Sequence, residues 1–225
     1  MSNTEKWRSR YDERAEKYGT SAKANDYRDY RQFKILQSIA GSILKGAENQ
    51  KILDIGCGNG SMSEPIAKKN TVYGLDFSSR MLKVAQKKNI IPISSNALHL
   101  PLADKSIDAT FCFGLLQLLG DPNDATQCMC ELQRVTKPSG ILILSTINGD
   151  SLLQRIACNI FKIEGKYYEK KYHAEEIYQF LEESSFTVEE IYLLYPPLPF
   201  YSKNLSLGVF SRLFSSTLII KAHKK

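Results

Sequence analysis

The apolar residues of this chain follow two spacings, one typical of helices and one typical of buried strands. Ahead of residue 48, apolar positions recur every three or four residues, which predicts helices over 5–18 and 26–46. Beyond it, short apolar runs alternate with helical spacing, and such runs are typical of strands buried on both faces of a parallel sheet. The predicted strands are 51–55, 71–75, 90–94, 107–113 and 141–146, and the predicted helices between them are 61–69, 78–88 and 121–136.

The last third of the chain predicts two further strands and changes the topology. Helices are expected over 150–161 and 174–184, and strands over 186–195 and 216–222. Two late strands separated by a loop can pair antiparallel at a sheet edge. The fold class predicted is therefore α/β, with a doubly wound, mostly parallel seven-stranded sheet, an antiparallel edge strand and an N-terminal helical cap.

Composition and charge narrow the function classes. The chain is 43% hydrophobic and 24% charged, which excludes disorder, collagen and coiled coil. Its net charge of +6 favours an acidic small substrate or a membrane surface, and its basic residues are spread out, so no nucleic-acid partner is expected. No apolar run approaches ~18 residues, so no membrane span is expected. Five cysteines without zinc spacing, behind a polar N-terminus, predict a reduced, cytoplasmic protein with no metal site.

The strongest chemical signal is a strand that runs directly into Gly56, Gly58 and Gly60. Glycines there allow a tight turn and let a ligand approach the backbone, although a purely structural turn is the alternative. The nicotinamide and flavin fingerprint G-x-G-x-x-G would require glycine at position 61, which is Ser61. Asp54, at the end of the strand, fits poorly beside a pyrophosphate and well beside an ammonium group or a backbone donor.

A second carboxylate follows at the tip of the next predicted strand. Asp76 lies twenty residues after Gly56, where an acidic residue can accept two hydrogen bonds from a ribose diol. The alternative is that Asp76 caps the following helix, but Ser78 is available for that role. Spacing and position together favour the ribose role.

Four motifs at 53–60, 74–78, 96–108 and 134–140 resemble those of the class I S-adenosylmethionine-dependent methyltransferases. The chain is most similar to the small-molecule branch that includes the ubiquinone- and menaquinone-type enzymes. The resemblance implies a Rossmann-like methyltransferase fold, S-adenosylmethionine as cofactor, and in-line methyl transfer to a small organic molecule. The acceptor atom, whether amine, hydroxyl or carbon, stays open.

The resemblance also implies a division of the chain, which we expect to form a single methyltransferase domain over 1–225. Residues 1–46 would form the helical cap and 48–147 the cofactor-binding core. Residues 148–225 would supply the substrate-side helices and the last two strands. Within that part, 196–214 could be a lid over an apolar substrate, a dimer contact or plain packing, and either a monomer or a homodimer is expected.

The resemblance further implies which residues contact the cofactor. The first loop would hold the methionine end of the cofactor, with Asp54 near its amino group. Asp76 would take the ribose hydroxyls and Phe77 would cover one face of adenine. Asn96 replaces the usual Asp beside adenine, and its amide can both accept and donate; Met81 either packs nearby or belongs to the core. The complete set of expected cofactor contacts is Asp54, Gly56, Cys57, Gly58, Asp76, Phe77, Met81, Asn96, Ala97, Leu98 and Phe113.

No residue stands out as a general base. Relatives commonly carry a histidine pair after the fourth strand, where this chain has Gln117, which can hydrogen-bond a substrate but cannot remove a proton. His173 either caps the helix that follows it or is a candidate for the base. Tyr11 and Tyr18 share one face of the first helix and either close over the site or simply pack. These four residues are the catalytic candidates.

Two other functions stay open at this point. A non-catalytic, cofactor-binding regulatory protein of the same fold is suggested by Gln117 and Asn96. A methyltransferase acting on RNA or protein is suggested only by the net charge. The fourth strand ends in Phe113-Gly114-Leu115-Leu116 rather than in the polar-Pro-Pro-aromatic motif of RNA target-adenine enzymes, which argues against that subgroup.

Overall fold

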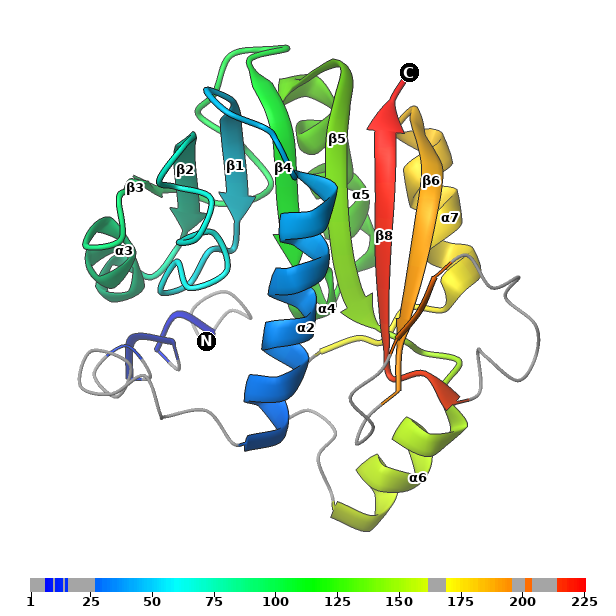
Figure 1. Cartoon of the computed structure of the whole chain (residues 1–225). Coiled ribbons are helices and arrows are strands. Elements are labelled where there is room, and N and C mark those ends of the chain that lie inside the picture. The colour runs from blue at the N-terminus through cyan, green and yellow to red at the C-terminus, as the bar shows by residue number, and fades with distance from the viewer. Residues whose placement is uncertain are drawn as a thin grey trace.

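The computed structural model of the chain describes residues 7–9, 11–13, 15, 27–161, 169–195, 201–203 and 214–225. These residues build one eight-stranded sheet with helices on both of its faces (Figure 1). Within these ranges, no helix combines the length and the hydrophobicity that a membrane-spanning segment requires.

The strands are ordered β3-β2-β1-β4-β5-β8-β6-β7 across the sheet. The first five are parallel, β8 runs antiparallel between β5 and β6, and β7 is an antiparallel edge strand. Their bounds are β1 (Lys51–Ile55), β2 (Thr71–Asp76), β3 (Ile90–Ser94), β4 (Ile107–Phe113), β5 (Thr136–Ile147), β6 (Phe186–Leu194), β7 (Tyr201–Lys203) and β8 (Thr217–Lys224).

The predicted fold class is confirmed, with one strand more than expected. The sheet is mostly parallel, doubly wound and antiparallel on one side. The additional strand is β7, whose three residues are too short to produce an alternating pattern in the sequence. The strand order reverses between β1 and β4, and ligands of open α/β sheets bind at such a point, outside the carboxyl ends of the strands.

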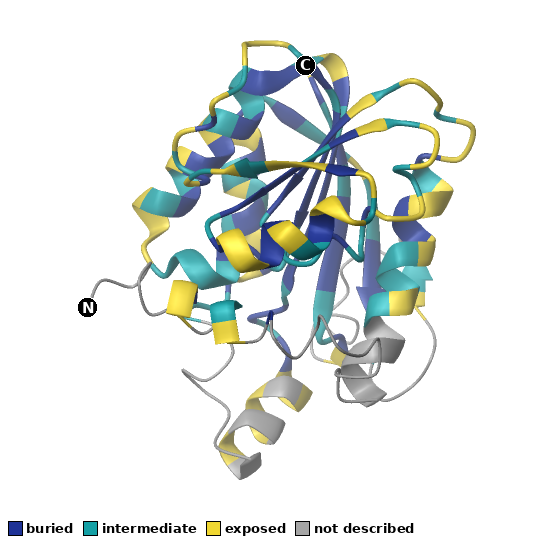
Figure 2. Cartoon of the chain, turned by 90° about the vertical axis from the view of Figure 1, so that its left-hand side faces the viewer, coloured by how far each residue is buried: buried dark blue, intermediate teal, exposed yellow. Residues whose placement is uncertain are grey.

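Helices cover the two faces of the sheet separately. On one face, Ile39 of α2 and Leu82 of α3 pack in one cluster with sheet residues such as Ile143. On the other, α4, α5 and α7 pack against the sheet, and Figure 2 shows the strands buried between the layers. The helices are α2 (Tyr27–Ile43), α3 (Ser79–Gln86), α4 (Leu116–Leu119), α5 (Pro122–Val135), α6 (Leu152–Phe161) and α7 (Ala174–Glu183).

The helix predicted over 61–69 is wrong, because that segment forms consecutive turns. A helix would need an N–H at position 65 to donate to the carbonyl of Ser61, and Pro65 has none. The side-chain Nε2 of Gln37, in α2, donates to that carbonyl instead, at 2.8 Å. The segment is therefore held partly by α2, through a residue 24 positions earlier in the sequence.

Candidate cofactor site

The glycine loop lies directly after β1, at the point where the strand order reverses. The backbone N–H groups of Gly56 and Cys57 both donate to the carbonyl of Leu75, at 2.7 and 3.0 Å. These bonds tie the loop to the carboxyl end of β2. They fix the path of the backbone up to the next residue, Gly58.

Gly60 and Gly58 differ in what surrounds the position that a Cβ atom would occupy. Gly60 has a φ of +72°, and a Cβ there would lie 2.4 Å from Cδ1 of Ile90 and 3.1 Å from Cα of Ala85, so the backbone conformation and the packing together disfavour a side chain. Gly58 has a φ of +52°, and a Cβ there would meet no atom within 4 Å. Its backbone therefore borders open space, as close approach of a ligand requires.

Asp76 is buried at the tip of β2 and faces the loop. Its Oδ2 accepts from the N–H of Gly58 at 2.9 Å, and its Oδ1 accepts from the N–H of Ser78 at 2.8 Å. Burial raises the pKa of this carboxyl above its ordinary value. The N-cap of α3 is Ser78, whose Oγ accepts from the N–H of Met81, so Asp76 is not needed as that cap. Each carboxylate oxygen keeps a lone pair for a further donor.

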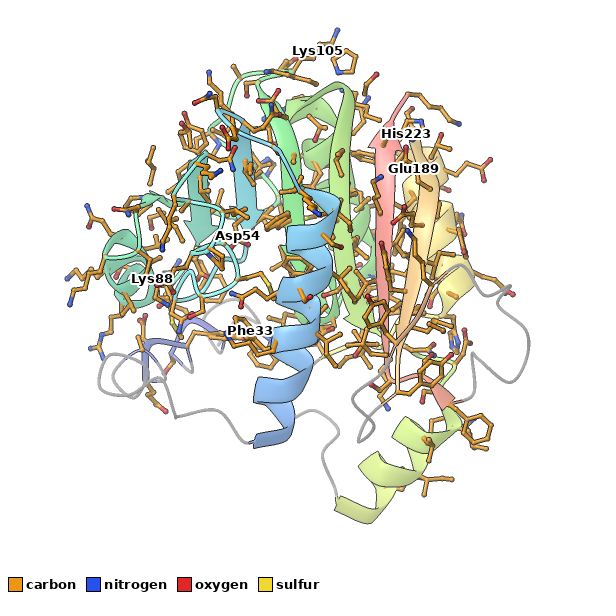
Figure 3. All side chains as sticks on the ribbon, in the orientation of Figure 1. Phe33, Asp54, Lys88, Lys105, Glu189 and His223 are labelled. Atoms are coloured by element: carbon orange, nitrogen blue, oxygen red, sulfur yellow. The ribbon has the colours of Figure 1, made fainter. Side chains whose placement is uncertain are left out.

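Asp54 is a second buried carboxylate, at the end of β1 (Figure 3). Its Oδ2 accepts from the hydroxyl of Ser63 at 2.5 Å. Burial, reinforced by the nearby charge of Asp76 and opposed by the Ser63 bond, raises the pKa of Asp54 to about 7. Two buried carboxylates with few compensating donors favour a cationic partner at this place.

Cys57 lies between these carboxylates and is chemically quiet. Burial, with the charges of Asp54 and Asp76, raises the pKa of its thiol far above the ordinary value. The thiol therefore stays protonated, and it contributes as a buried side chain that donates to the carbonyl of Gly58 at 3.5 Å.

The N-terminal helical residues pack against the same site. The hydroxyl of Ser78 donates to Oδ1 of Asp12 at 2.5 Å. The ring of Tyr11 stands edge-on to Phe77, with centroids 6.2 Å apart, and Trp7 lies 6.1 Å from Tyr11. Tyr11 thus lies beside Phe77, the residue that follows Asp76, whereas Tyr18 lies outside the described residues.

The remaining predicted contacts lie in α3, in the loop that follows β3 and at the end of β4. Asn96 is exposed, and its Oδ1 accepts from the N–H of Leu98 at 3.1 Å. Ala97 and Met81 are buried, so each presents little polar surface to a ligand. Phe113, at the end of β4, is half-buried and packs against a neighbouring ring.

Gln117 and His173 both take part in structural contacts. Oε1 of Gln117 accepts from the N–H of Ile147 at 3.1 Å, which links α4 to the end of β5. His173 occupies the N-cap position of α7, as one of the two interpretations predicted, and its Nδ1 lies 2.6 Å from Oδ1 of Asp150. Both side chains are thus engaged in contacts within the chain.

Three site residues were missed by sequence reasoning. Ser63, Asp12 and Leu115 contact the predicted residues, through the hydroxyl bond to Asp54, the bond from Ser78 and packing beneath Gly56. No motif marks them, since each contact joins segments that come together only in the fold. The polar residue Ser63 within an otherwise helix-like stretch was the one available hint.

An acidic cradle beside an open glycine loop suits a cofactor that carries a ribose and a positive charge. That character separates this site from the pyrophosphate sites of dinucleotide-binding folds, which offer backbone N–H groups to anions. The fold and the site thus define a Rossmann-like protein for a cationic nucleoside cofactor.

Comparison with known proteins identifies the family. Residues 53–144 match the methyltransferase domain family. The demethylmenaquinone methyltransferase of Staphylococcus epidermidis is 30% identical over 178 residues, which are 72% of this chain and 71% of that protein. The demethylmenaquinone methyltransferase of Renibacterium salmoninarum is 34% identical over 139 residues, which are 60% of this chain and 56% of that protein. The chain therefore belongs to the class I S-adenosylmethionine-dependent methyltransferases, as its four motifs predicted.

The extent of these matches is limited, and solved structures add the fold. The chain spans 52% and 56% of the length of the first two curated relatives it matches. The magnesium protoporphyrin IX methyltransferase of Synechocystis PCC 6803, solved with bound SAH, is similar with a TM-score of 0.73 over 100% of both chains. At 16% identity this likeness shows a shared methyltransferase fold.

Proposed function

We propose that this protein transfers the methyl group of S-adenosylmethionine to a small organic acceptor. The observation that carries the proposal is the pair of buried carboxylates, Asp54 and Asp76, beside the open backbone at Gly58. The cofactor has the two groups that such a pair satisfies, an ammonium and a ribose diol. Family membership supports the same conclusion.

Each group of the cofactor has a proposed partner in the chain. Asp54 holds the ammonium, and the backbone of Gly56 and Gly58 lies along the methionine part. Asp76 accepts from the ribose hydroxyls with the lone pairs that its two backbone bonds leave over. Phe77 covers adenine. The remaining proposed contacts are Cys57, Met81, Asn96, Ala97, Leu98 and Phe113.

Methyl transfer from a sulfonium depends more on aligning the methyl group with the acceptor than on a reactive side chain. When bound, the cofactor supplies a sulfonium methyl group, an electrophile open to in-line displacement. The chain holds the reacting groups in line and excludes water around them. The packing of Tyr11 on Phe77 places the N-terminal segment where it can do the second task.

An amine acceptor needs only to be unprotonated, whereas a hydroxyl acceptor profits from a base. Gln117 and His173, at the carboxyl edge, are proposed to position the acceptor, and Tyr11 and Tyr18 to close over it. Gln117 already bonds Ile147, and His173 already bonds Asp150. These contacts support a positioning role for both residues rather than proton transfer.

The proposed division of the chain follows from the same arrangement. One methyltransferase domain over 1–225 would contain a helical cap at 1–46, a cofactor-binding core at 48–147 and acceptor-side elements at 148–225. The burial of Ile39 and Ala40 of α2 against the sheet supports a cap that is packed onto the core.

Titration calorimetry with S-adenosylmethionine and with S-adenosylhomocysteine tests the proposal. We expect both to bind with micromolar affinity, and absence of binding at millimolar ligand would overturn it. Incubation with a panel of amines, phenols and enols then tests transfer. Binding without transfer to any acceptor would favour the non-catalytic regulatory protein, and salt-dependent retention of RNA on filters would favour a macromolecular substrate.

A further inference from the structure

An exposed apolar surface lies on the acceptor side of the molecule. Leu152, Leu153 and Ile156 of α6, together with Tyr201 and Phe214, are between 39% and 47% exposed. We refer to these five residues as the edge patch. They make up all but one of the large apolar side chains that are exposed within the described part of the chain.

Backbone bonds hold the α6 part of the edge patch beside Phe214. The N–H of Asn148 donates to the carbonyl of Ser216 at 2.9 Å, and its side-chain Nδ2 donates to the carbonyl of Ser215 at 3.0 Å. Asn148 in turn accepts from the N–H of Ser151, immediately before α6. The start of α6 and the residue that precedes β8 are thus fixed to each other.

Strand register places Tyr201 in the same row. Ile147 pairs with Thr217, Thr217 pairs with Leu194, and Leu194 pairs with Tyr201. This row crosses the sheet at the carboxyl end of β5, the end at which β1 opens into the glycine loop. Figures 1 and 2 both show α6 projecting beyond that end of the sheet.

Positive charge is concentrated in the same stretches of sequence. Residues 151–171 hold five Lys or Arg against two Asp or Glu, and residues 196–216 hold two against none. The excess of Lys and Arg over Asp and Glu in these two stretches is five, and two of their cations, Lys170 and Lys203, form ion pairs with Glu176 and Glu190 outside them. On α6 itself, Arg155 is exposed beside Ile156.

We propose that the edge patch docks this protein on the surface of an anionic lipid bilayer. A short helix with aliphatic side chains on one face and a flanking cation lies in the interfacial plane of a membrane, and anionic lipid strengthens the contact. An exposed apolar patch of this kind is uncommon on a protein that has no partner. The side chains that α6 contributes are aliphatic and offer neither hydrogen bonds nor stacking to bases, so a bilayer fits this helix better than RNA.

Docking of the edge patch gives the proposed methyl transfer a substrate class. The patch and the glycine loop share one edge of the sheet, so a docked protein presents its acceptor side to the lipid. The acceptor is then an amphiphile that resides in the bilayer. This last step rests on the proposed function, whereas docking itself does not.

Vesicle sedimentation of the full chain tests the docking. The vesicles are phosphatidylcholine alone, or phosphatidylcholine with about one quarter phosphatidylglycerol. We expect the protein to sediment with the anionic vesicles, and to do so at least about tenfold more weakly as a Leu152→Ser, Leu153→Ser, Ile156→Ser variant. Arg155→Glu should weaken binding severalfold and flatten its salt dependence.

Two variants away from the patch serve as controls. Ile91→Ser replaces a 46% exposed side chain on β3, at the opposite edge of the sheet. Lys45→Glu reverses an exposed charge between α2 and β1. Both should sediment like the unaltered protein, and all variants should keep the binding of S-adenosylhomocysteine, which shows that they fold.

Three outcomes would overturn the docking proposal. The first is no sedimentation of the unaltered protein with anionic vesicles. The second is an equal loss in the Ile91→Ser control. The third is a dimer that the triple variant converts to monomer while vesicles are not bound, which would assign the edge patch to a second copy of the chain. Failure of the unaltered protein to bind S-adenosylhomocysteine would instead count against the proposed function and leave the docking proposal standing.

Discussion

The carboxyl edge of the sheet is built differently over its two halves. Beside β1 and β2, Asp54 and Asp76 are buried. Asp54 accepts from the Ser63 hydroxyl, and Asp76 accepts from two backbone N–H groups. Beside β5, β8 and β6, apolar side chains such as Ile156 and Phe214 face solvent. Buried polar groups must be satisfied in one geometry, whereas exposed apolar groups need only a surface to meet. One half is therefore shaped for a defined cofactor and the other for a class of partner.

Among substitutions that should affect only the cofactor half of this edge, we expect the largest loss of affinity at Gly58. A branched side chain at its φ of +52° would fill the open space beside the loop. We expect Gly58→Val to weaken S-adenosylhomocysteine binding by at least about a hundredfold, since both the strained backbone and the lost space oppose the ligand. Calorimetry measures the loss, and vesicle sedimentation should be unchanged.

Gly46→Val is the matched control for that substitution. Gly46 also has a positive φ, +84°, and open space around its Cβ position, but it follows α2 at the other end of the sheet. The Gly46→Val variant should be less stable than the unaltered protein but bind S-adenosylhomocysteine with the same affinity. Equal affinity losses in the two variants would mean that backbone strain, and not ligand approach, accounts for the effect.

Asp76→Ala is expected to be the next largest. It removes the proposed ribose acceptor and also the two backbone bonds that order Gly58 and Ser78. The expected loss is about 2–4 kcal/mol of cofactor affinity. Circular dichroism should stay close to that of the unaltered protein, and an unchanged dissociation constant would contradict the assignment of Asp76.

Asp54 should make both stability and affinity depend on pH, in opposite directions. Its pKa is about 7 in the folded chain against an ordinary 3.8, so the folded state holds a proton that the unfolded state has released between these values. The free energy of unfolding should therefore fall as pH rises from about 4 to about 7, by up to about 1.4 kcal/mol per pH unit. Cofactor affinity should rise over the upper part of the same range, because the ionised carboxylate is the form that pairs with an ammonium.

Asp54→Asn is the variant that checks this pH dependence. Urea unfolding should show a flatter pH profile for it than for the unaltered protein, and its cofactor affinity should be weaker and nearly independent of pH. A wild-type affinity that does not change from pH 5.5 to about 7.5 would remove the ammonium role from Asp54.

The smallest predicted effect concerns the N-terminal segment. Asp12→Ala removes the bond from Ser78 and should loosen the packing of Tyr11 on Phe77, at a cost of about 1 kcal/mol. We expect protease to cut residues 1–30 readily in the free protein and more slowly with S-adenosylhomocysteine bound. Asp12→Ala should lose most of that protection, and Glu13→Ala, an exposed neighbour, should keep it.

Turnover sharpens the same test. A Tyr11→Phe, Tyr18→Phe variant should lose turnover more than stability if the segment closes over the site. Cleavage that is equally slow with and without ligand would show that the N-terminal helices are a fixed part of the fold.

Local pattern was sufficient for some of these features and not for others. The cap of α3 by Ser78 follows from the residue type at a helix start, and so it was predicted. The pairing of Ser63 with Asp54 needs two segments to meet, and no local pattern records that. The exposure of the edge patch was not predicted, because which apolar side chains of 150–161 and 196–214 stay exposed depends on how segments distant in sequence pack together.

The bond from Gln37 to the carbonyl of Ser61 bears on how this chain could be taken apart. It supplies, from α2, the donor that Pro65 lacks, in the segment that leaves the glycine loop. A polypeptide shortened to begin at residue 48 would keep every parallel strand but leave that carbonyl without its donor. Exchanging the first 46 residues with those of a relative would therefore also replace a residue that supports the glycine loop. A chimeric protein without a hydrogen-bond donor at position 37 should have a less ordered cofactor site.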